Sequence, residues 1–139
     1  MSHLKSKSEI NLSAAEVLLD KHTYYASSVH CSYYGCFQFI RSKLNQIGIT
    51  YEKIDQDIAY SRQPGVTTLH SHLYPIKLIL DEIEKKSDKF YKRTLKNKIF
   101  DLKEYREISD YRNVVVGYDE SNKAFNLSKE IIKLISSKI

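Results

Sequence analysis

The chain has 139 residues and a formal net charge of +5, which suits one domain with a single core and permits a nucleic-acid partner without requiring one. No apolar run approaches the roughly 20 residues that span a bilayer, and no charged-then-apolar signal segment opens the chain. We therefore expect a soluble, cytoplasmic protein with no membrane partner. With only 4 glycines and 2 prolines, turn signals are few, which indicates an all-helical fold.

The N-terminal part of the chain is polar before an apolar run begins. Residues 1–10 are expected to be frayed, and residues 11–139 to form one helical domain. A first helix is predicted to begin near Ser13, because Ser13 and Glu16 have the spacing of a capping box. The segment Asp20–Thr23 is expected to break this helix.

A long helix is predicted from Tyr25 to Ile47, with Gly48 as its C-cap. Its apolar positions have the spacing of a core stripe, formed by Ala26, Val29, Tyr33, Cys36, Ile40, Leu44 and Ile47. A second stripe lies beside the first and mixes aromatic and basic side chains: His30, Tyr34, Phe37 and Arg41. A second buried face indicates a dimer contact or a lined groove, or simply a helix that packs on two neighbours.

The cysteines lie within this helix. Cys31 and Cys36 are five residues apart, so they point to different faces of a helix. We interpret them as reduced thiols, neither a disulfide nor a metal pair.

The second half of the chain is predicted to contain three more helices. A polar connection over Tyr51–Gly65, which can include a short helical turn, leads to a helix over Thr68–Lys86 that Pro75 kinks or starts. A further helix covers Arg93–Arg112. After a break at Val114–Glu120, the last helix is capped by Ser121 and carries Ala124, Leu127, Ile131 and Leu134. Short connections favour an up-and-down bundle of four to five helices.

Basic residues are concentrated between Lys85 and Lys98. This segment holds seven basic residues and one acid, Asp88, with Phe90 and Tyr91 among them. Such a mixture can follow a phosphate backbone and stack on bases, with Lys92 and Arg93 as candidate contacts. The alternatives are a solvated loop and helix start, or a contact for an acidic partner.

Two opposite charges continue the apolar stripe of the fourth predicted helix. Leu95, Ile99 and Leu102 recur at spacings of four and three, and the same spacing leads to Arg106 and Asp110. An unpaired charge in apolar surroundings costs several kcal/mol, roughly, so each should have a partner. The pair is therefore either a structural clamp or the centre of a polar site.

Common signatures of cofactor or metal chemistry are not found in the sequence. It contains no Walker loop, no dinucleotide fingerprint and no Gly-x-Ser-x-Gly elbow. It also lacks a His-x-x-x-His pair, and His70 and His72 would diverge on a helix. We expect neither a cofactor nor a metal.

Two segments resemble motifs of the HEPN domain (higher eukaryotes and prokaryotes nucleotide-binding), in its small stand-alone prokaryotic form. Ser28–Phe37 (SVHCSYYGCF) resembles the Tyr-Tyr-Ala helix of that family, and Tyr105–Tyr111 (YREISDY) resembles its Arg-x-x-x-Asp-Tyr helix. The order of the predicted helices also fits, over about residues 11–138. The resemblance implies a helical bundle, usually a homodimer, with a nucleotide- or RNA-related role in toxin–antitoxin or phage-defence systems.

The chain departs from the catalytic pattern of HEPN ribonucleases, which is an arginine followed after four to six residues by a histidine. Arg112 is followed after five residues by Tyr118 instead. Metal-independent RNA cleavage needs a group that takes the proton of the 2′-hydroxyl, and histidine suits this at neutral pH whereas tyrosine does not. Tyr118 would have to be strongly activated, or His30 or His70 would have to approach from another helix.

These expectations combine into an RNA- or nucleotide-binding protein, with ribonuclease activity left open. Arg106 and Arg112 would hold phosphate and Asp110 would orient Arg106. The candidate catalytic residues are thus Arg106, Asp110, Arg112 and Tyr118, and the candidate binding residues are His30, Tyr34, Arg41, Tyr111, Lys92 and Arg93.

Two alternatives involve no chemistry by this chain. It could be a catalytically inactive interaction subunit, in which Arg106 and Asp110 form a clamp inside the bundle. It could also be the partner of a minimal nucleotidyltransferase that modifies Tyr118, a role suggested only by the HEPN resemblance.

Overall fold

A computed structural model describes residues 3–21 and 24–139, and this part of the chain is all-helical, as predicted. It contains six helices and no strand: α1 His3–Asp20, α2 Tyr25–Gln46, α3 Tyr51–Tyr60, α4 Leu73–Lys86, α5 Lys89–Tyr111 and α6 Tyr118–Ser136. Within these ranges, no helix is both long enough and apolar enough to cross a membrane.

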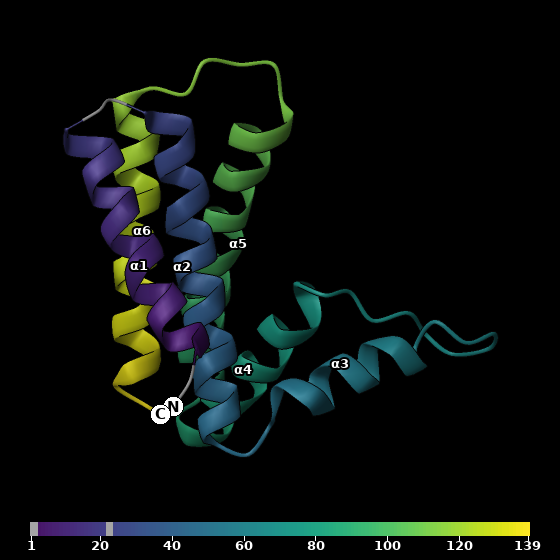
Figure 1. Cartoon of the computed structure of the whole chain (residues 1–139). Coiled ribbons are helices and arrows are strands. Elements are labelled where there is room, and N and C mark those ends of the chain that lie inside the picture. The colour runs from purple at the N-terminus through teal and green to yellow at the C-terminus, as the bar shows by residue number, and fades with distance from the viewer. Residues whose placement is uncertain (1–2, 22–23) are drawn as a thin grey trace.

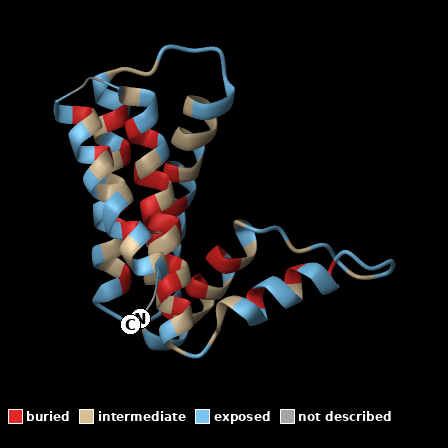
Figure 2. Cartoon of the chain, in the orientation of Figure 1, coloured by how far each residue is buried: buried red, intermediate tan, exposed pale blue. Residues whose placement is uncertain are grey.

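Four of the helices stand side by side and enclose most of the core. Figure 1 shows α1, α2, α5 and α6 together, with α3 and α4 projecting from one end of α2 and a loop joining α5 to α6 at the other end. Buried residues lie on all four of these helices, and α3 and α4 carry further buried residues (Figure 2). They include the predicted stripe of α5, Leu95, Ile99 and Leu102. In α2, Val29, Tyr33, Cys36, Ile40 and Leu44 are buried as predicted, whereas Ala26 is exposed and Ile47 only half-buried.

Helix α1 packs closely on α2 through small residues. The Ser8 hydroxyl donates to the Gly35 carbonyl at 2.6 Å, and the Ser28 hydroxyl donates to the Ala15 carbonyl at 2.7 Å. A Cβ atom at Gly35 would lie 2.8 Å from the Leu12 side chain, closer than packed carbons allow. A larger residue at position 35 therefore requires the Leu12 side chain or α1 to shift.

The start of α1 corrects the expectation of a frayed N-terminus for residues 3–10, the part of that segment which the structure describes. The helix begins at His3 rather than near Ser13, and Ser8 is buried against α2. Apolar periodicity does not predict this contact, because the residues that make it are polar. The predicted break at Asp20–Thr23 agrees with the end of α1 at Asp20, but His22 and Thr23 lie outside the described residues.

Helix α3 is an additional helix that the sequence did not predict. The sequence indicated a polar connection here, which could include a short helical turn. Thr50 caps it by accepting a hydrogen bond from the Lys53 amide at 3.2 Å. Only Ile54 and Ile58 are buried, so its apolar pattern is short. The preceding Gly48 has a φ of 95°, which confirms its predicted place after the end of α2.

The remaining helices begin at other residues than predicted. Helix α4 begins at Leu73 rather than Thr68, so that Pro75 lies in its first turn. Helix α5 begins at Lys89, because the Asp88 carboxylate accepts the Tyr91 amide hydrogen at 2.7 Å. Helix α6 begins at Tyr118, and Ser121 is buried within it instead of capping it.

Candidate functional site

Arg106 lies between α5 and α2, near the end of the bundle where α5 stops. Its Nη2 group donates to the Tyr34 hydroxyl at 2.7 Å and to the Tyr111 hydroxyl at 2.9 Å. Its Nε lies 3.1 Å from Asp110 Oδ2, although the orientation does not make a hydrogen bond. The side chain is 12% exposed. Leu102 places it there, because Arg106 follows one helical turn later on the buried stripe.

Aromatic rings surround the Arg106 guanidinium. Its central carbon lies 5.4 Å from the ring centre of Tyr33, 5.3 Å from that of Tyr34 and 5.0 Å from that of Tyr111. Ring faces attract a cation without neutralising its charge. Burial lowers the pKa of Arg106, but interactions with Tyr34, Tyr111 and Asp110 more than offset this, so that its pKa is raised overall. The site therefore keeps a fixed positive charge.

His30, on α2, meets the same carboxylate from the other side. Its Nδ1–H donates to Asp110 Oδ2 at 3.0 Å, because a carboxylate can only accept. In the neutral imidazole this leaves the lone pair on Nε2, which makes no hydrogen bond within the described residues. The ring packs on Tyr34, with centres 4.6 Å apart. The imidazole is thus held by Asp110 in the tautomer that accepts a proton at Nε2.

His30 and Asp110 open onto a shallow depression between α2 and α5. Its volume is about 320 Å³, and it is lined by Ala26, Ser27, His30, Cys31, Ser109 and Asp110. The His30 side chain is 49% exposed and the Asp110 side chain 18%. The Ser109 hydroxyl donates to the Ala26 carbonyl at 3.0 Å, which joins the two helices at this edge. The polar cluster therefore reaches solvent through His30.

A second histidine lies on the inner side of the cluster. The hydroxyl of Tyr33 lies 2.8 Å from His72 Nδ1, and the His72 ring stacks on Phe37 with centres 4.5 Å apart. Burial, followed by the positive charge of Arg106, lowers the pKa of His72. Burial likewise raises the pKa of Tyr33. Both side chains are therefore neutral at neutral pH and fix the ring that Arg106 contacts.

The structure brings five of the sequence-predicted site residues together, which are His30, Tyr34, Arg106, Asp110 and Tyr111. The other five lie apart. Arg112 is exposed just after the end of α5. Tyr118 is the first residue of α6, and its ring meets that of Tyr25 edge to face, with ring centres 6.0 Å apart. Arg41 extends toward α3, where Nη2 lies 3.4 Å from Asp55 Oδ1. None of these contacts Arg106 in the described structure.

Three of the seven basic residues of the segment Lys85–Lys98 pair with acids, so part of its positive charge is compensated within the chain. Lys92 Nζ lies 3.1 Å from Asp81 and 2.7 Å from Glu84. Lys85 pairs with Glu82 and Lys98 with Glu130. Lys92 and Arg93 line a surface hollow with Lys89 and Lys96, but this lies at the opposite end of α5 from Arg106. The two predicted binding regions are therefore separate.

Tyr33 and His72 are part of the cluster that the sequence did not assign to the site. Tyr33 was placed in the core stripe, which is correct, but its hydroxyl adds a polar function that periodicity does not show. His72 lies just before α4, 39 residues from Tyr33 along the chain. Only the tertiary fold brings these two together.

Arg106 is not sealed inside the bundle by acids. It has one carboxylate partner, Asp110, and two tyrosine hydroxyls, one of which belongs to Tyr111, a 71% exposed residue.

Known family models, curated proteins and solved structures provide no match to this chain. The cluster around Arg106 is therefore the basis for the function proposed below.

Proposed function

We propose that this protein binds RNA at the Arg106 cluster and cleaves it without a metal, with His30 as the general base. The observation that carries the proposal is that His30 and Arg106 contact the same oxygen of Asp110, at 3.0 Å and 3.1 Å. A proton acceptor and a fixed cation are thereby held within reach of a single nucleotide.

In the proposed reaction, His30 Nε2 takes the proton of a ribose 2′-hydroxyl. That oxygen attacks the adjacent phosphorus, the bond to the 5′-oxygen of the next nucleotide breaks, and a 2′,3′-cyclic phosphate forms. The departing oxygen takes a proton from water in the open depression. Asp110 holds Nδ1–H and stabilises the imidazolium, while the Arg106 guanidinium attracts the developing negative charge.

Tyr111 gives the substrate a route to Arg106. Its ring is exposed and its hydroxyl accepts one Nη2 hydrogen bond, so a phosphate oxygen can replace that hydroxyl if Tyr111 rotates outward. The freed ring then offers a face on which a base can stack. Tyr34 stays in place, because it is partly buried and packs against Tyr33 and His30.

The HEPN-like assignment is part of this proposal. The two segments that resemble HEPN motifs supply Tyr34 and Arg106, whose side chains are joined by a hydrogen bond. The histidine that the family places after its arginine is absent, and we propose that His30 takes this role from α2. Membership of a toxin–antitoxin or phage-defence system, a homodimer and a cytoplasmic location belong to the same proposal.

The test measures cleavage of a fluorescently labelled single-stranded RNA in EDTA. We expect His30→Ala to slow cleavage by about 10²–10⁴-fold, the usual contribution of a general base. His70→Ala is the matched control, because His70 is an exposed histidine outside the cluster, and it should leave the rate unchanged. Equal rates for wild type and His30→Ala would reject His30 as the base.

Binding is tested separately from cleavage with a 2′-O-methyl RNA, which lacks the attacking hydroxyl. Wild type and His30→Ala should bind this RNA with similar affinity, whereas Arg106→Lys should bind it more weakly, because lysine cannot make the bidentate contact of arginine. If Arg106→Lys binds as well as wild type, Arg106 does not hold the phosphate.

The second candidate function is an interaction subunit without chemistry, including a partner of a minimal nucleotidyltransferase. It is favoured by the low exposure of Arg106, whose side chain is 12% exposed, and by its ion pair with Asp110 one helical turn away. It predicts no RNA cleavage and no RNA binding by the wild type. Tyr118, 48% exposed at the start of α6, would be the modified residue, which mass spectrometry after co-expression with such an enzyme would detect.

A further inference from the structure

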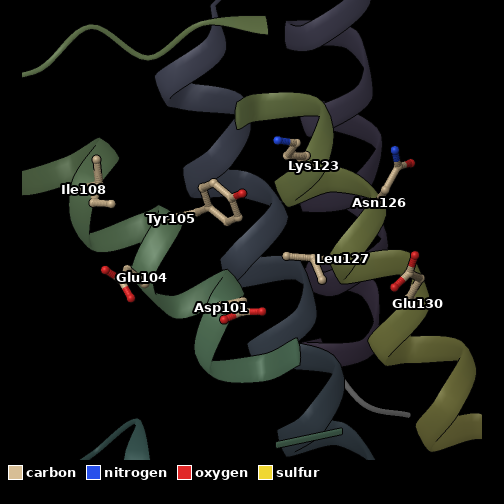
Figure 3. Close-up of a pocket in the computed structure, with 8 residues that line it drawn as sticks. All are labelled: Asp101, Glu104, Tyr105, Ile108, Lys123, Asn126, Leu127 and Glu130. Carbon is tan, nitrogen blue, oxygen red and sulfur yellow. The ribbon is translucent and has the colours of Figure 1, made fainter. Parts of the chain in front are cut away.

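A groove lies between α5 and α6, away from His30. Its volume is about 570 Å³. Figure 3 shows the residues that line it, Asp101, Glu104, Tyr105 and Ile108 from α5 and Lys123, Asn126, Leu127 and Glu130 from α6. These α5 residues occupy a different face from Arg106, because Tyr105 and Arg106 are separated by about 100° around the helix. The groove is therefore distinct from the proposed RNA site.

The bottom of the groove is apolar. Tyr105 and Leu127 are half-buried and pack on the core, and Figure 3 shows both side chains between the two helices. Ile108, also half-buried, extends the apolar surface toward the end of α5. From Asp101 to Ile108 the groove follows α5 for about 10 Å, or two turns. This length and the apolar floor suit the anchoring side chains of another helix.

The rim of the groove is acidic in a protein that is basic overall. Three carboxylates and one lysine line it, whereas the whole chain carries +5. Glu130 is paired with Lys98 at 2.9 Å. Asp101 and Glu104 form no ion pair or hydrogen bond within the described residues. Two carboxylates on one side of the groove are therefore available to an incoming cation.

We propose that this groove docks an amphipathic helix of a partner protein, with apolar side chains on Tyr105 and Leu127 and lysine or arginine beside Asp101 and Glu104. Two helices lying side by side present the ridges and grooves on which a third helix packs. Charge complementarity selects a basic helix over an acidic one. The proposal does not depend on RNA cleavage, since no residue of the groove contacts His30 or Arg106.

The probe is a designed helical peptide of about 18 residues, or five turns, with leucines on one face and lysines on both flanks. Its control is the same peptide with every lysine replaced by glutamate. Binding is measured by isothermal titration calorimetry, and NMR shift changes locate the contact. We expect the basic peptide to bind, the acidic one not to bind, and the shifts to centre on α5 and α6.

Asp101→Lys combined with Glu104→Lys should weaken binding of the basic peptide about tenfold or more. Both residues are exposed, so the fold should persist, which circular dichroism checks. The matched control combines Glu9→Lys with Glu52→Lys, which changes the net charge equally on exposed positions of α1 and α3 and should bind as wild type does.

Three outcomes would overturn the proposal. The first is no binding of the basic peptide, and the second is equal loss of binding in both double variants, which would indicate unspecific charge attraction. The third is self-association of the wild type that the groove variant abolishes, because the groove would then hold a second copy of this chain. Each differs from a failure of RNA cleavage, which would leave the groove binding unaffected.

Discussion

Lys92 and Arg106 lie on the same helix, 14 residues and about 21 Å apart, yet they are partnered in opposite ways. Lys92 contacts two carboxylates of α4, which more than balance its charge. Arg106 contacts one carboxylate and lies over three aromatic rings. Only the second arrangement keeps a cation attractive to phosphate. A dense run of lysines was therefore a weaker indicator of a binding site than one arginine on an apolar stripe.

The largest contrast between the two cations should be in stability. We expect Arg106→Ala to lower the free energy of unfolding by about 3 kcal/mol, because it removes the cation that pairs with Asp110 and the donor to two tyrosine hydroxyls. Lys92→Ala should change it little, because the Lys92 ion pairs are exposed to solvent. Urea denaturation measures both. An Arg106→Ala protein as stable as wild type would show that Arg106 is no clamp.

Removing the Tyr33 hydroxyl tests the inner support of Arg106. Tyr33→Phe should cost about 1 kcal/mol, because the buried contact with His72 Nδ1 is lost. Tyr34→Phe is the comparison, since it removes a hydroxyl that accepts directly from Arg106. Thermal denaturation of the two variants shows which hydroxyl contributes more. If neither is destabilised, the aromatic rings rather than the hydroxyls hold Arg106.

The pH dependence of stability should report on His72. Because the pKa of His72 is lowered in the folded protein, the His72 imidazole is protonated more readily in the unfolded chain. The contribution of neutral His72 is therefore complete above the ordinary histidine value of 6.5 and is lost as pH falls through that value and below it. His72→Phe keeps the stacking on Phe37 without titrating, so its stability should fall less between pH 7 and pH 5, in urea titrations at each pH.

Neutralising the two acidic partners of Lys92 should increase the attraction of RNA to the N-terminal end of α5. Asp81→Asn with Glu84→Gln leaves Lys92 without its two acidic partners. We expect RNA affinity to rise several-fold and its salt dependence to steepen, because more counterions are released on binding. Fluorescence anisotropy at several salt concentrations measures this. An unchanged affinity would mean that this surface does not reach the RNA.

Tyr111 should give the smallest effect. Tyr111→Phe removes one hydroxyl at an exposed position, so the unfolding free energy should change by no more than about 0.5 kcal/mol. Binding of 2′-O-methyl RNA should be kept or slightly improved, because Nη2 of Arg106 loses a competing acceptor. A large loss of affinity would assign the hydroxyl itself to the RNA contact.

The sequence predicted the helices with long apolar stripes and failed where polar residues pack. The stripes of α2 and α5 place Tyr34 and Arg106 on facing helices, and the mixed stripe that contains His30 was visible as a second face. Helix α3 was missed because only Ile54 and Ile58 are buried, and the start of α1 because Ser8 packs by a hydrogen bond. The contact between Tyr33 and His72 depends on where α4 begins, which local pattern does not determine.

Gly35 has a consequence for how the site is supported. Ser8, whose hydroxyl bonds to the Gly35 carbonyl, and Leu12, whose side chain occupies the space of the missing Cβ, bring α1 against the middle of the helix that carries His30 and Tyr34. A methyl group at position 35 would push against the Leu12 side chain and crowd the Ser8 carbonyl. The small size of Gly35, rather than its flexibility, thus determines how closely α1 packs on α2, the helix that carries His30 on its other face.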